Sequence, residues 1–320
     1  MDLSIIIVNY RSASYTLHAV ASALEQEVAR SDGDGRGEME VLVIDNGSSP
    51  EDAALLEGLP RSVKLIRNGA NIGFAAAANQ GIREASGKFI CLLNPDTHLF
   101  PGALKRLLEH LHDHPEVAAA GPRAWWDEER TVLLPLVRLP TPGSMIVESL
   151  AGLNYRIGRA FCRLWHHRDL ALWQSADPMP IDMLCGACLV IRREILGRVG
   201  GFDPAYPLYY EDADWCRRVR RQGYSLAYVP AAEIVHYYNQ SAQSVPEESM
   251  EWVVRSRRRY LEKEFGRWPA ALCERIAAAA GRLAGRWNLA PPEPLYVDLG
   301  PQQEPPLFNH GEGEIGRAHV

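Results

Sequence analysis

Over its first 120 residues the chain alternates between short, almost wholly apolar runs and longer amphipathic stretches. This alternation is typical of strands that are buried on both faces of a parallel sheet and joined by helices, so it predicts an α/β fold. The predicted strands are 3–8, 41–44, 63–66 and 89–93. After the first strand, apolar residues recur at helical spacing behind Ser12, which we expect to cap that helix.

Polar residues follow each of these four strands directly. They are Asn9 with Tyr10, Asp45 with Asn46, Asn68, and Asn94 with Asp96. The carboxyl ends of parallel strands lie along one edge of a sheet, where open α/β folds bind ligands. The sequence therefore predicts a binding site at that edge, built from segments far apart in the chain.

The rest of the chain divides into regions of different character. We expect a helix at 101–112, a strand at 117–120, regular structure again at 183–191, and helices at 211–222, 247–265 and 269–287. Residues 121–180 are rich in Trp, Pro, Arg and His with weak periodicity, and we interpret them as an insertion over the site. The predicted organisation is a domain over 1–240, a helical C-terminal region over 241–290, and a disordered tail over 291–320.

Composition excludes several classes of protein. With 47% hydrophobic residues the chain can bury a large core, and its net charge of -6 argues against a nucleic-acid partner. The N-terminus lacks the features of a signal peptide, and no apolar run approaches the roughly 20 residues of a membrane-spanning helix. Six scattered cysteines are typical of buried thiols in a reducing cytosol, so we expect a cytoplasmic protein. Cys185 and Cys188 have the spacing of a redox or zinc pair but no second pair, and we interpret them as structural.

Three of the polar segments allow both a functional and a structural interpretation. Asp45 could accept hydrogen bonds from a ribose or a base edge, or could simply close a turn. Gly73 would let the backbone approach a diphosphate at the start of a helix on which Asn79 faces the site, or the segment is only a loop entering an Ala-rich packing helix. Asp96 offers the hard oxygens that suit Mg²⁺ or Mn²⁺, or belongs to an Asx-Pro turn.

Three carboxylates, Glu211, Asp212 and Asp214, open a predicted helix directly behind an aromatic run at 206–210. The helix macrodipole favours acidic residues in a first turn, which explains one or two of them. A carboxylate in a recess behind the aromatic run could instead take a proton from a hydroxyl. His236 follows a strand-like run, and a lone histidine is more often structural than a ligand.

Taken in order, these segments resemble the family 2 glycosyltransferases of the GT-A fold, particularly the rhamnosyltransferase-like branch of bacterial cell-surface polysaccharide assembly. The matching segments are 6–10, 43–48, 71–75 with Asn79, 92–96, 186–187 with 201–203, 210–215, and His236 with Ser241. The resemblance implies a Rossmann-like, mostly parallel central sheet flanked by helices. Residues 1–120 would then form the nucleotide-sugar-binding half, and 181–240 the acceptor and catalytic half.

The resemblance also implies an activity and a role for each matching residue. The activity is the inverting transfer of a sugar from a nucleotide diphosphate sugar to an acceptor hydroxyl, with Mn²⁺ or Mg²⁺ as cofactor. Asp212 would be the general base with Glu211 as its neighbour, while Asp96 and His236 would hold the metal. Asn94 stands where the family's motif has its first carboxylate, so metal affinity would be modest. The nucleotide-sugar-binding residues would be Asn9, Tyr10, Asp45, Asn46, Asn71, Gly73, Phe74, Asn79, Asn94 and Asp96, and the acceptor-side residues Gly186, Ala187, Tyr210 and Trp215.

The donor and the acceptor are less closely defined. The branch suggests dTDP-rhamnose, with UDP-linked sugars left open, and a glycan or lipid-linked acceptor; the oligomeric state, including a homo-oligomer, is also open. The basic aromatic stretch at 252–260 either lies against anionic lipid on the inner face of the membrane or is a solvated helix face.

Three other functions compete with this one. A nicotinamide-dependent oxidoreductase would need a GxGxxG sequence after the first strand, and a sugar nucleotidyltransferase a glycine-rich, basic loop there; neither is present. A non-catalytic relative that binds carbohydrate or nucleotide sugar would have no use for Asp96, Asp212 and His236 together.

Overall fold

The computed structural model describes residues 1–28, 37–134, 138–151, 175–237, 246–286 and 297–298. Its centre is a set of parallel strands in the order β3, β2, β1, β4. Their bounds are β1 (Leu3–Asn9), β2 (Met39–Asp45), β3 (Val63–Arg67) and β4 (Phe89–Leu93). The predicted α/β fold is therefore confirmed, and each predicted strand has the expected place in the chain.

Beyond β4 the sheet becomes mixed. β9 (Cys188–Arg192) pairs antiparallel with both β4 and β6 (Val117–Trp125), and β10 (Ser225–His236) pairs parallel with β6. The shorter strands β5 (Thr97–Leu99) and β8 (Met179–Ile181) pair antiparallel with β10. At the far edge lie β7 (Val132–Leu133) and β11 (Val297–Asp298).

The region predicted as an insertion contains more regular structure than expected. β6 continues to Trp125, β7 and the helix α5 (Pro142–Ala151) lie within 121–180, and β8 begins there. The continuation of β6 was not predicted because it contains Pro122, and proline is uncommon in central strands. Residues 152–174 lie outside the described residues, as does the predicted tail apart from Val297 and Asp298.

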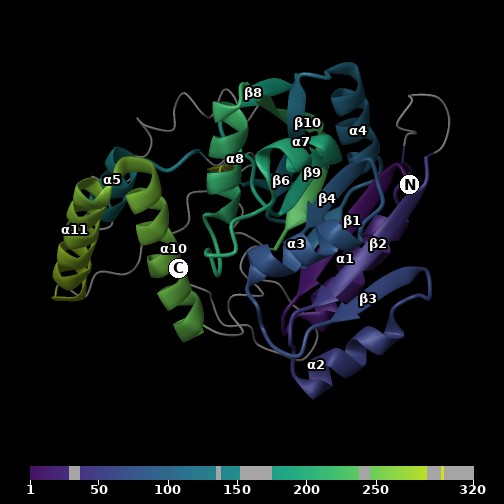
Figure 1. Cartoon of the computed structure of the whole chain (residues 1–320), viewed down its shortest axis with the longest axis horizontal. Helices are drawn as coiled ribbons and strands as arrows, with labels where there is room; N and C mark the ends of the chain where they lie inside the picture. Colours follow the sequence, from purple (N-terminus) through teal and green to yellow (C-terminus); the bar gives the residue numbers. More distant parts are fainter. Residues whose placement is uncertain (29–36, 135–137, 152–174, 238–245, 287–296, 299–320) are drawn as a thin grey trace.

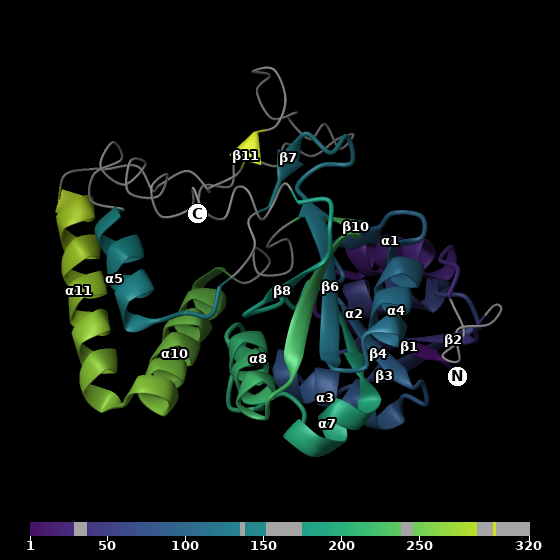
Figure 2. The same cartoon turned by 90° about the horizontal axis from the view of Figure 1, so that it is seen from above.

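Helices cover both faces of the sheet (Figures 1 and 2). Along β1, Ile5 and Ile7 pack with the core on one face, while Ile6 and Val8 pack on the other. Helices α1 (Ala13–Leu24) and α4 (Ala103–Asp113) cover the first face. The second face is covered by α3 (Phe74–Glu84), α7 (Arg193–Val199) and α8 (Glu211–Arg221). A short helix α2 (Pro50–Leu55) runs into the 3-10 turn η1 (Leu56–Gly58) beside β3.

The start of α1 differs from the prediction in one detail. Ser12 occupies the N-cap position, but its side chain makes no capping hydrogen bond and instead donates to Asn9 Oδ1 at 3.3 Å. The Asp52 carboxylate, from α2, accepts the hydrogen bond of the Ala13 N–H at 2.9 Å. The helix is thus capped by a residue distant in sequence, which no local pattern could reveal.

Two long helices, α10 (Pro246–Phe265) and α11 (Arg267–Arg286), form a hairpin with α5 packed against α11 (Figures 1 and 2). Gly266, with φ of +90°, occupies the turn between them. Tyr260 and Leu261 of α10 are completely buried, and the Tyr260 hydroxyl accepts a hydrogen bond from Arg217 of α8 at 3.0 Å. None of the helices in the described part of the chain combines the length and the apolar character needed to cross a bilayer.

Candidate functional site

The polar residues that end β1 and β2 meet. Asn9 is completely buried, and its Nδ2 lies within hydrogen-bond distance of Asp45 Oδ1 (3.2 Å), Ser48 Oγ (2.9 Å) and Asp52 Oδ2 (3.1 Å). Its Oδ1 accepts a hydrogen bond from Thr16 Oγ1 at 2.7 Å. Asn9 therefore holds the loop that carries Asp45. Its side chain has no exposed surface, and Asp45 has almost none at 3%, so the nucleotide contact expected of Asn9 stays a prediction.

A second amide cluster ties the loop after β3 to the end of β2. Asn46 is nearly buried; its Nδ2 donates to Asn71 Oδ1 at 2.8 Å, and its Oδ1 accepts from Asn68 Nδ2 and from the Ile72 N–H, both at 3.2 Å. Asp45 Oδ1 accepts the N–H of Ser48 at 3.3 Å, so the predicted turn is present as well. Asn46 thus positions the 68–73 loop beside the Asp45 carboxylate.

Two glycines let these loops approach closely. Gly47 has φ of +79°, and a Cβ there would collide with the backbone of Ala70 and Asn71. Gly73 has φ of +83° and precedes α3, whose first N–H, that of Phe74, donates to the Pro207 carbonyl at 3.2 Å. The predicted nucleotide half therefore touches the loop that leads into α8. Gly47 was not singled out from the sequence, although a glycine directly behind a strand-ending Asp-Asn pair is a usable signal.

Asp96 and His236 come together from β4 and β10. His236 Nε2 lies 3.4 Å from Asp96 Oδ1, and both side chains are buried. The pairing of β10 with β5 sets this contact, because it places His236 opposite Thr97, and the Tyr237 N–H donates to the Asp96 carbonyl at 3.0 Å. The pKa of Tyr15, on α1, is raised by burial and by the negative charge of Asp96. The charge of Asp96 thus reaches Tyr15, although the place of Tyr15 in an ordinary helical pattern gave no sign of it.

The Asp96 and His236 pair has suitable chemistry for a divalent cation. Among the described residues no group of three or more His, Cys, Asp and Glu side chains gathers where it could hold a metal ion. A carboxylate oxygen and an imidazole nitrogen are nevertheless ligands that Mn²⁺ accepts, and Mg²⁺ or Mn²⁺ beside a substrate diphosphate commonly uses few protein ligands. The two side chains fit a site that is completed by the substrate.

The three carboxylates that open α8 have separate surroundings. Asp212 Oδ2 accepts the Gly186 N–H at 3.2 Å, and its Oδ1 accepts the Ala213 N–H at 2.7 Å. Asp214 is fully buried and forms ion pairs with Arg218, at 2.8 Å, and with Lys263. Asp214 is thus a structural anchor of the helix, while Asp212 contacts the segment that leads into β9.

Glu211 and Asp212 both have raised pKa values. Glu211 is 6% exposed, and its Oε2 has no hydrogen-bond partner among the described residues. Burial, together with the charge of Asp212, raises the pKa of Glu211 well above its usual range. Burial also raises the pKa of Asp212, against the opposing effect of the N–H groups of Ala213 and Gly186. The pair therefore holds a proton more readily than two exposed carboxylates would.

The dipeptide Gly186-Ala187 links the Asp96 turn to Asp212. The Ala187 carbonyl accepts hydrogen bonds from the Asn94 N–H at 2.9 Å and from Thr97 Oγ1 at 3.3 Å, while the Gly186 N–H donates to Asp212. Cys185, the preceding residue, is exposed, so it is not one of the buried thiols that the sequence predicted. This dipeptide thus connects the turn that carries Asp96 with the Asp212 carboxylate at the same edge of the sheet.

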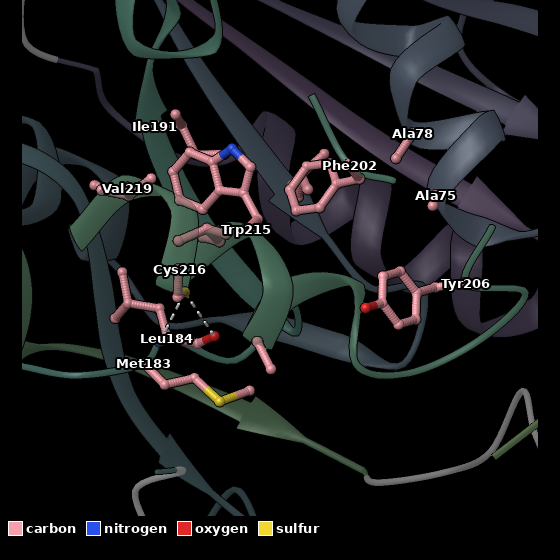
Figure 3. Packing of buried hydrophobic residues seen from close by; sticks show 14 of the residues in the cluster. Ala75, Ala78, Met183, Leu184, Ile191, Phe202, Tyr206, Trp215, Cys216 and Val219 are labelled. Carbon is pink, nitrogen blue, oxygen red and sulfur yellow. Dashed lines mark hydrogen bonds between the residues drawn. The ribbon is translucent and has the colours of Figure 1, made fainter. Parts of the chain in front are cut away.

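Two predicted site residues support the structure. Trp215, expected on the acceptor side, has no exposed surface; it packs on Phe202 with ring centroids 5.8 Å apart and donates to the Gly200 carbonyl at 3.1 Å (Figure 3). Asn79 donates to the Phe202 carbonyl at 2.6 Å and accepts the Phe202 N–H at 2.9 Å. Both residues anchor the Gly201-Phe202 segment. Trp215 has no surface left for an acceptor, whereas Asn79 is half-buried and lines a cavity beside Phe202, so its predicted place in the donor pocket stays a prediction.

The remaining aromatic candidates are half-buried. The guanidinium of Arg11 lies over the Tyr10 ring at 5.2 Å, and Tyr210 lies beside Tyr260 with ring centroids 5.5 Å apart. Tyr209 and Tyr210 both have positive φ, +62° and +67°, directly before α8. Such backbone is strained for bulky residues and is often found at functional sites.

The basic stretch at 252–260 is largely neutralised. Arg257 pairs with Glu274 of α11, Arg258 with Glu262, and Arg259 with Asp203, each at 2.9 Å. Of the two interpretations of this stretch, the structure favours an ion-paired helix face over a free cationic surface.

Comparison with known proteins places this geometry in a family. The sequence model of glycosyl transferase family 2 matches residues 4–200. An N-acetylglucosaminyl-diphospho-decaprenol L-rhamnosyltransferase of Mycobacterium tuberculosis is 31% identical over 216 residues, which make up 62% of this chain. The match covers 66% of that relative's length.

Two solved structures share the fold. The mannosyltransferase PcManGT of Pyrobaculum calidifontis, in complex with GDP-Man and Mn²⁺, superposes with a TM-score of 0.51 at 17% identity, over 89% of this chain and 75% of its own. GalNAc-T7 with UDP, GalNAc and Mn²⁺ gives 0.52 at 14% identity, over 92% and 59%. The fold is thus the GT-A type that the sequence predicted. The family model covers more than half of the 320 residues of this chain, and the chain therefore belongs to glycosyl transferase family 2.

Proposed function

We propose that this protein is an inverting glycosyltransferase that moves a sugar, with rhamnose as the first candidate, from a nucleotide diphosphate sugar to a hydroxyl of a lipid-linked or cell-surface glycan. The observation that carries the proposal is the linkage of Asp212 to the Asp96 turn through Gly186 and Ala187. The name of the mycobacterial relative supports a rhamnosyl donor and a lipid-linked acceptor.

The nucleotide would bind at the ends of β1 and β2. Asp45 is the carboxylate there, and its loop is held in place by Asn9 and Asn46. The backbone at Gly73 and the half-buried ring of Tyr10 lie at the same sheet edge. These groups suit a nucleoside with its diphosphate directed toward Asp96, and dTDP-rhamnose and UDP-sugars are the donors to test first.

Asp96 and His236 would hold Mn²⁺ or Mg²⁺. The solved structures of both fold relatives are complexes with Mn²⁺. When bound, the ion supplies positive charge that offsets the negative charge growing on the departing diphosphate. Asp96 and His236, already in contact and buried, need little rearrangement to bind it.

Asp212 acts as the general base in the proposed reaction. Its carboxylate takes the proton of the acceptor hydroxyl while the hydroxyl oxygen forms a bond to the anomeric carbon. The bond from that carbon to the diphosphate oxygen breaks on the opposite side, which inverts the configuration. The Gly186 N–H orients Asp212, and the raised pKa of Asp212 brings its basicity closer to neutral pH, where a general base works best.

The test is Asp212→Asn, which keeps the shape and removes the base. Transfer is expected to fall by about 10²–10⁴-fold, while the donor dissociation constant, measured by isothermal titration calorimetry with Mn²⁺, stays unchanged. The control is Asp182→Asn, which removes an exposed carboxylate of the same chain. An Asp212→Asn variant that transfers at the wild-type rate would remove Asp212 from the base role. A wild-type protein that binds donors but turns none over would favour a binding-only relative.

A further inference from the structure

The cations of the C-terminal hairpin have two different environments. On α10, Arg257, Arg258 and Arg259 are held in ion pairs. On α11, Arg275 and Arg282 are exposed and form no ion pair with any described residue, and the same holds for Arg267 at the hairpin turn. The free positive charge of the arm is therefore on α11, outside the stretch that the sequence pattern singled out.

The outward face of α11 combines these arginines with apolar side chains. Trp268 is 89% exposed and Leu272 is 54% exposed. Residues 268, 272, 275 and 282 recur at helical spacing and lie on one side of the helix. The opposite side, with Ala270, Cys273 and Ala280, is buried. In Figures 1 and 2, α11 lies at the outer edge of the molecule, away from the sheet. We call residues 268, 272, 275 and 282 the outer face of α11.

No acidic residue accompanies these cations. The one acidic residue between Arg267 and Arg286 is Glu274, and its carboxylate is paired with Arg257. An ordinary solvated helix face usually carries charges of both signs and seldom exposes a tryptophan. Exposed Trp and Leu between unpaired arginines are instead the composition of helices that lie in the interface of an anionic bilayer.

We propose that the outer face of α11 binds the surface of an anionic lipid bilayer. Trp268 and Leu272 enter the headgroup region, and Arg275 and Arg282 contact lipid phosphates. The choice of lipid as the partner rests on the proposed function, in which the acceptor is lipid-linked. With a net charge of -6, the chain as a whole is repelled by anionic lipid, so binding depends on this local cationic face.

A second copy of the chain is a poorer occupant. Twofold pairing would bring the same face of both copies together, and its arginines would then meet arginines without an acidic partner. An anionic bilayer offers a negatively charged partner to every arginine of this face. Charge complementarity therefore favours the bilayer.

The experiment is co-sedimentation of the full chain with vesicles at low salt. Phosphatidylcholine vesicles are compared with vesicles of equal parts phosphatidylcholine and phosphatidylglycerol, and binding is expected only to the second. Arg275→Glu with Arg282→Glu should weaken that binding at least about tenfold, since each arginine near an anionic surface contributes appreciably. The matched control, Arg61→Glu with Arg83→Glu, makes the same charge change at two exposed arginines beside β3 and on α3 and should bind like wild type.

A second readout is quenching of tryptophan fluorescence by brominated lipid, which should decrease in Trp268→Phe.

Several results would overturn the proposal. One is a wild-type protein that does not bind anionic vesicles, and another is equal binding by the Arg275→Glu, Arg282→Glu variant and its control. A third is a combination of two results: wild type does not bind vesicles, and the outer-face variant elutes as a smaller species than wild type in size-exclusion chromatography. That combination would make the face a protein interface. Transfer of the sugar to a short, water-soluble acceptor should be the same in wild type and in these variants. If wild type does not transfer the sugar to that soluble acceptor, the result counts against the proposed function, while the membrane proposal still stands on the vesicle experiment.

Discussion

At the scale of single residues, buried Glu211 should make stability depend on pH. Its pKa in the folded chain is raised well above the ordinary 4.5, so above pH 4.5 the unfolded side chain ionises while the folded one stays protonated. The contribution of Glu211 to the free energy of unfolding is therefore fully present below pH 4.5 and is lost as the pH rises through the folded pKa. The loss is about 1.4 kcal/mol for each unit between the two pKa values.

Glu211→Gln removes this dependence. We expect the variant to be more stable than wild type at about pH 8 and no more stable below pH 4.5, as measured by urea unfolding. A smaller slope of the same sign remains, because the pKa of Asp212 is also raised. Glu57→Gln, at an exposed carboxylate, is the control. A stability difference between Glu211→Gln and wild type that stays constant with pH would show that Glu211 is ionised in the folded protein.

Single residues also show where sequence reasoning reached its limit. Asp96 and Asp212 could be found because each stands in a polar cluster at the edge of an apolar run. The roles of Asn9 and Trp215 could not be judged, because a polar or aromatic residue beside a site has the same pattern whether it faces the ligand or the core. Tyr15 was missed because its connection with Asp96 depends on how α1 lies against the sheet.

At the scale of elements, two nearby carboxylates in the first turn of α8 have different partners. Asp214 is fully buried and forms ion pairs with Arg218 of the same helix and Lys263 of α10, whereas the hydrogen bonds that Asp212 accepts within the described part of the chain come from main-chain N–H groups. The hairpin thus holds the helix whose first turn contains Asp212. Breaking the Asp214 ion pairs should loosen the helix, whereas neutralising Asp212 should not.

Asp214→Asn is therefore expected to lower the free energy of unfolding by about 2 kcal/mol, less than a fully buried pair would lose, because Arg218 and Lys263 keep some contact with water. Asp212→Asn should not lower the free energy of unfolding, because the raised pKa of Asp212 means that its ionised form is disfavoured in the folded chain. Both values come from urea unfolding followed by circular dichroism, with Arg258→Ala, at an exposed ion pair, as a control. Equal destabilisation by the two Asp→Asn variants would contradict the separation of a structural and a catalytic carboxylate.

Elements were predicted best where each lies within one continuous pattern. The strands from β1 to β4 and the helices α8, α10 and α11 have close to their predicted bounds, since their apolar periodicity is local. The extension of β6 and the antiparallel insertion of β9 between β4 and β6 depend on partners elsewhere in the chain. The face of α11 that stays exposed is likewise decided by α5 and α10, which no single-helix pattern contains.

At the scale of the whole molecule, ligand binding should appear as a gain in global stability. A ligand that binds only the folded chain stabilises it by RT ln(1 + [L]/Kd), about 2.7 kcal/mol at a hundredfold excess over Kd. Nucleoside diphosphates with Mn²⁺ are therefore expected to raise the melting temperature, and the base that gives the largest shift identifies the donor nucleotide.

Asp96→Ala separates the metal contribution from the nucleotide contribution. The variant should lose most of the additional shift that Mn²⁺ gives with a nucleoside diphosphate, and should keep the smaller shift that the nucleoside monophosphate gives without metal. His236→Ala should behave in the same direction, because the two side chains are in contact. Asp127, which is buried in a loop and accepts main-chain hydrogen bonds from Thr131 and Val132, lies outside this site. Its variant Asp127→Asn should therefore keep a Mn²⁺-dependent shift even where the starting melting temperature falls. A Mn²⁺-dependent shift of full size in Asp96→Ala would mean that the ion binds elsewhere, and the edge of the sheet between Asp96 and Asp212 would then have to act on the diphosphate with protein groups alone.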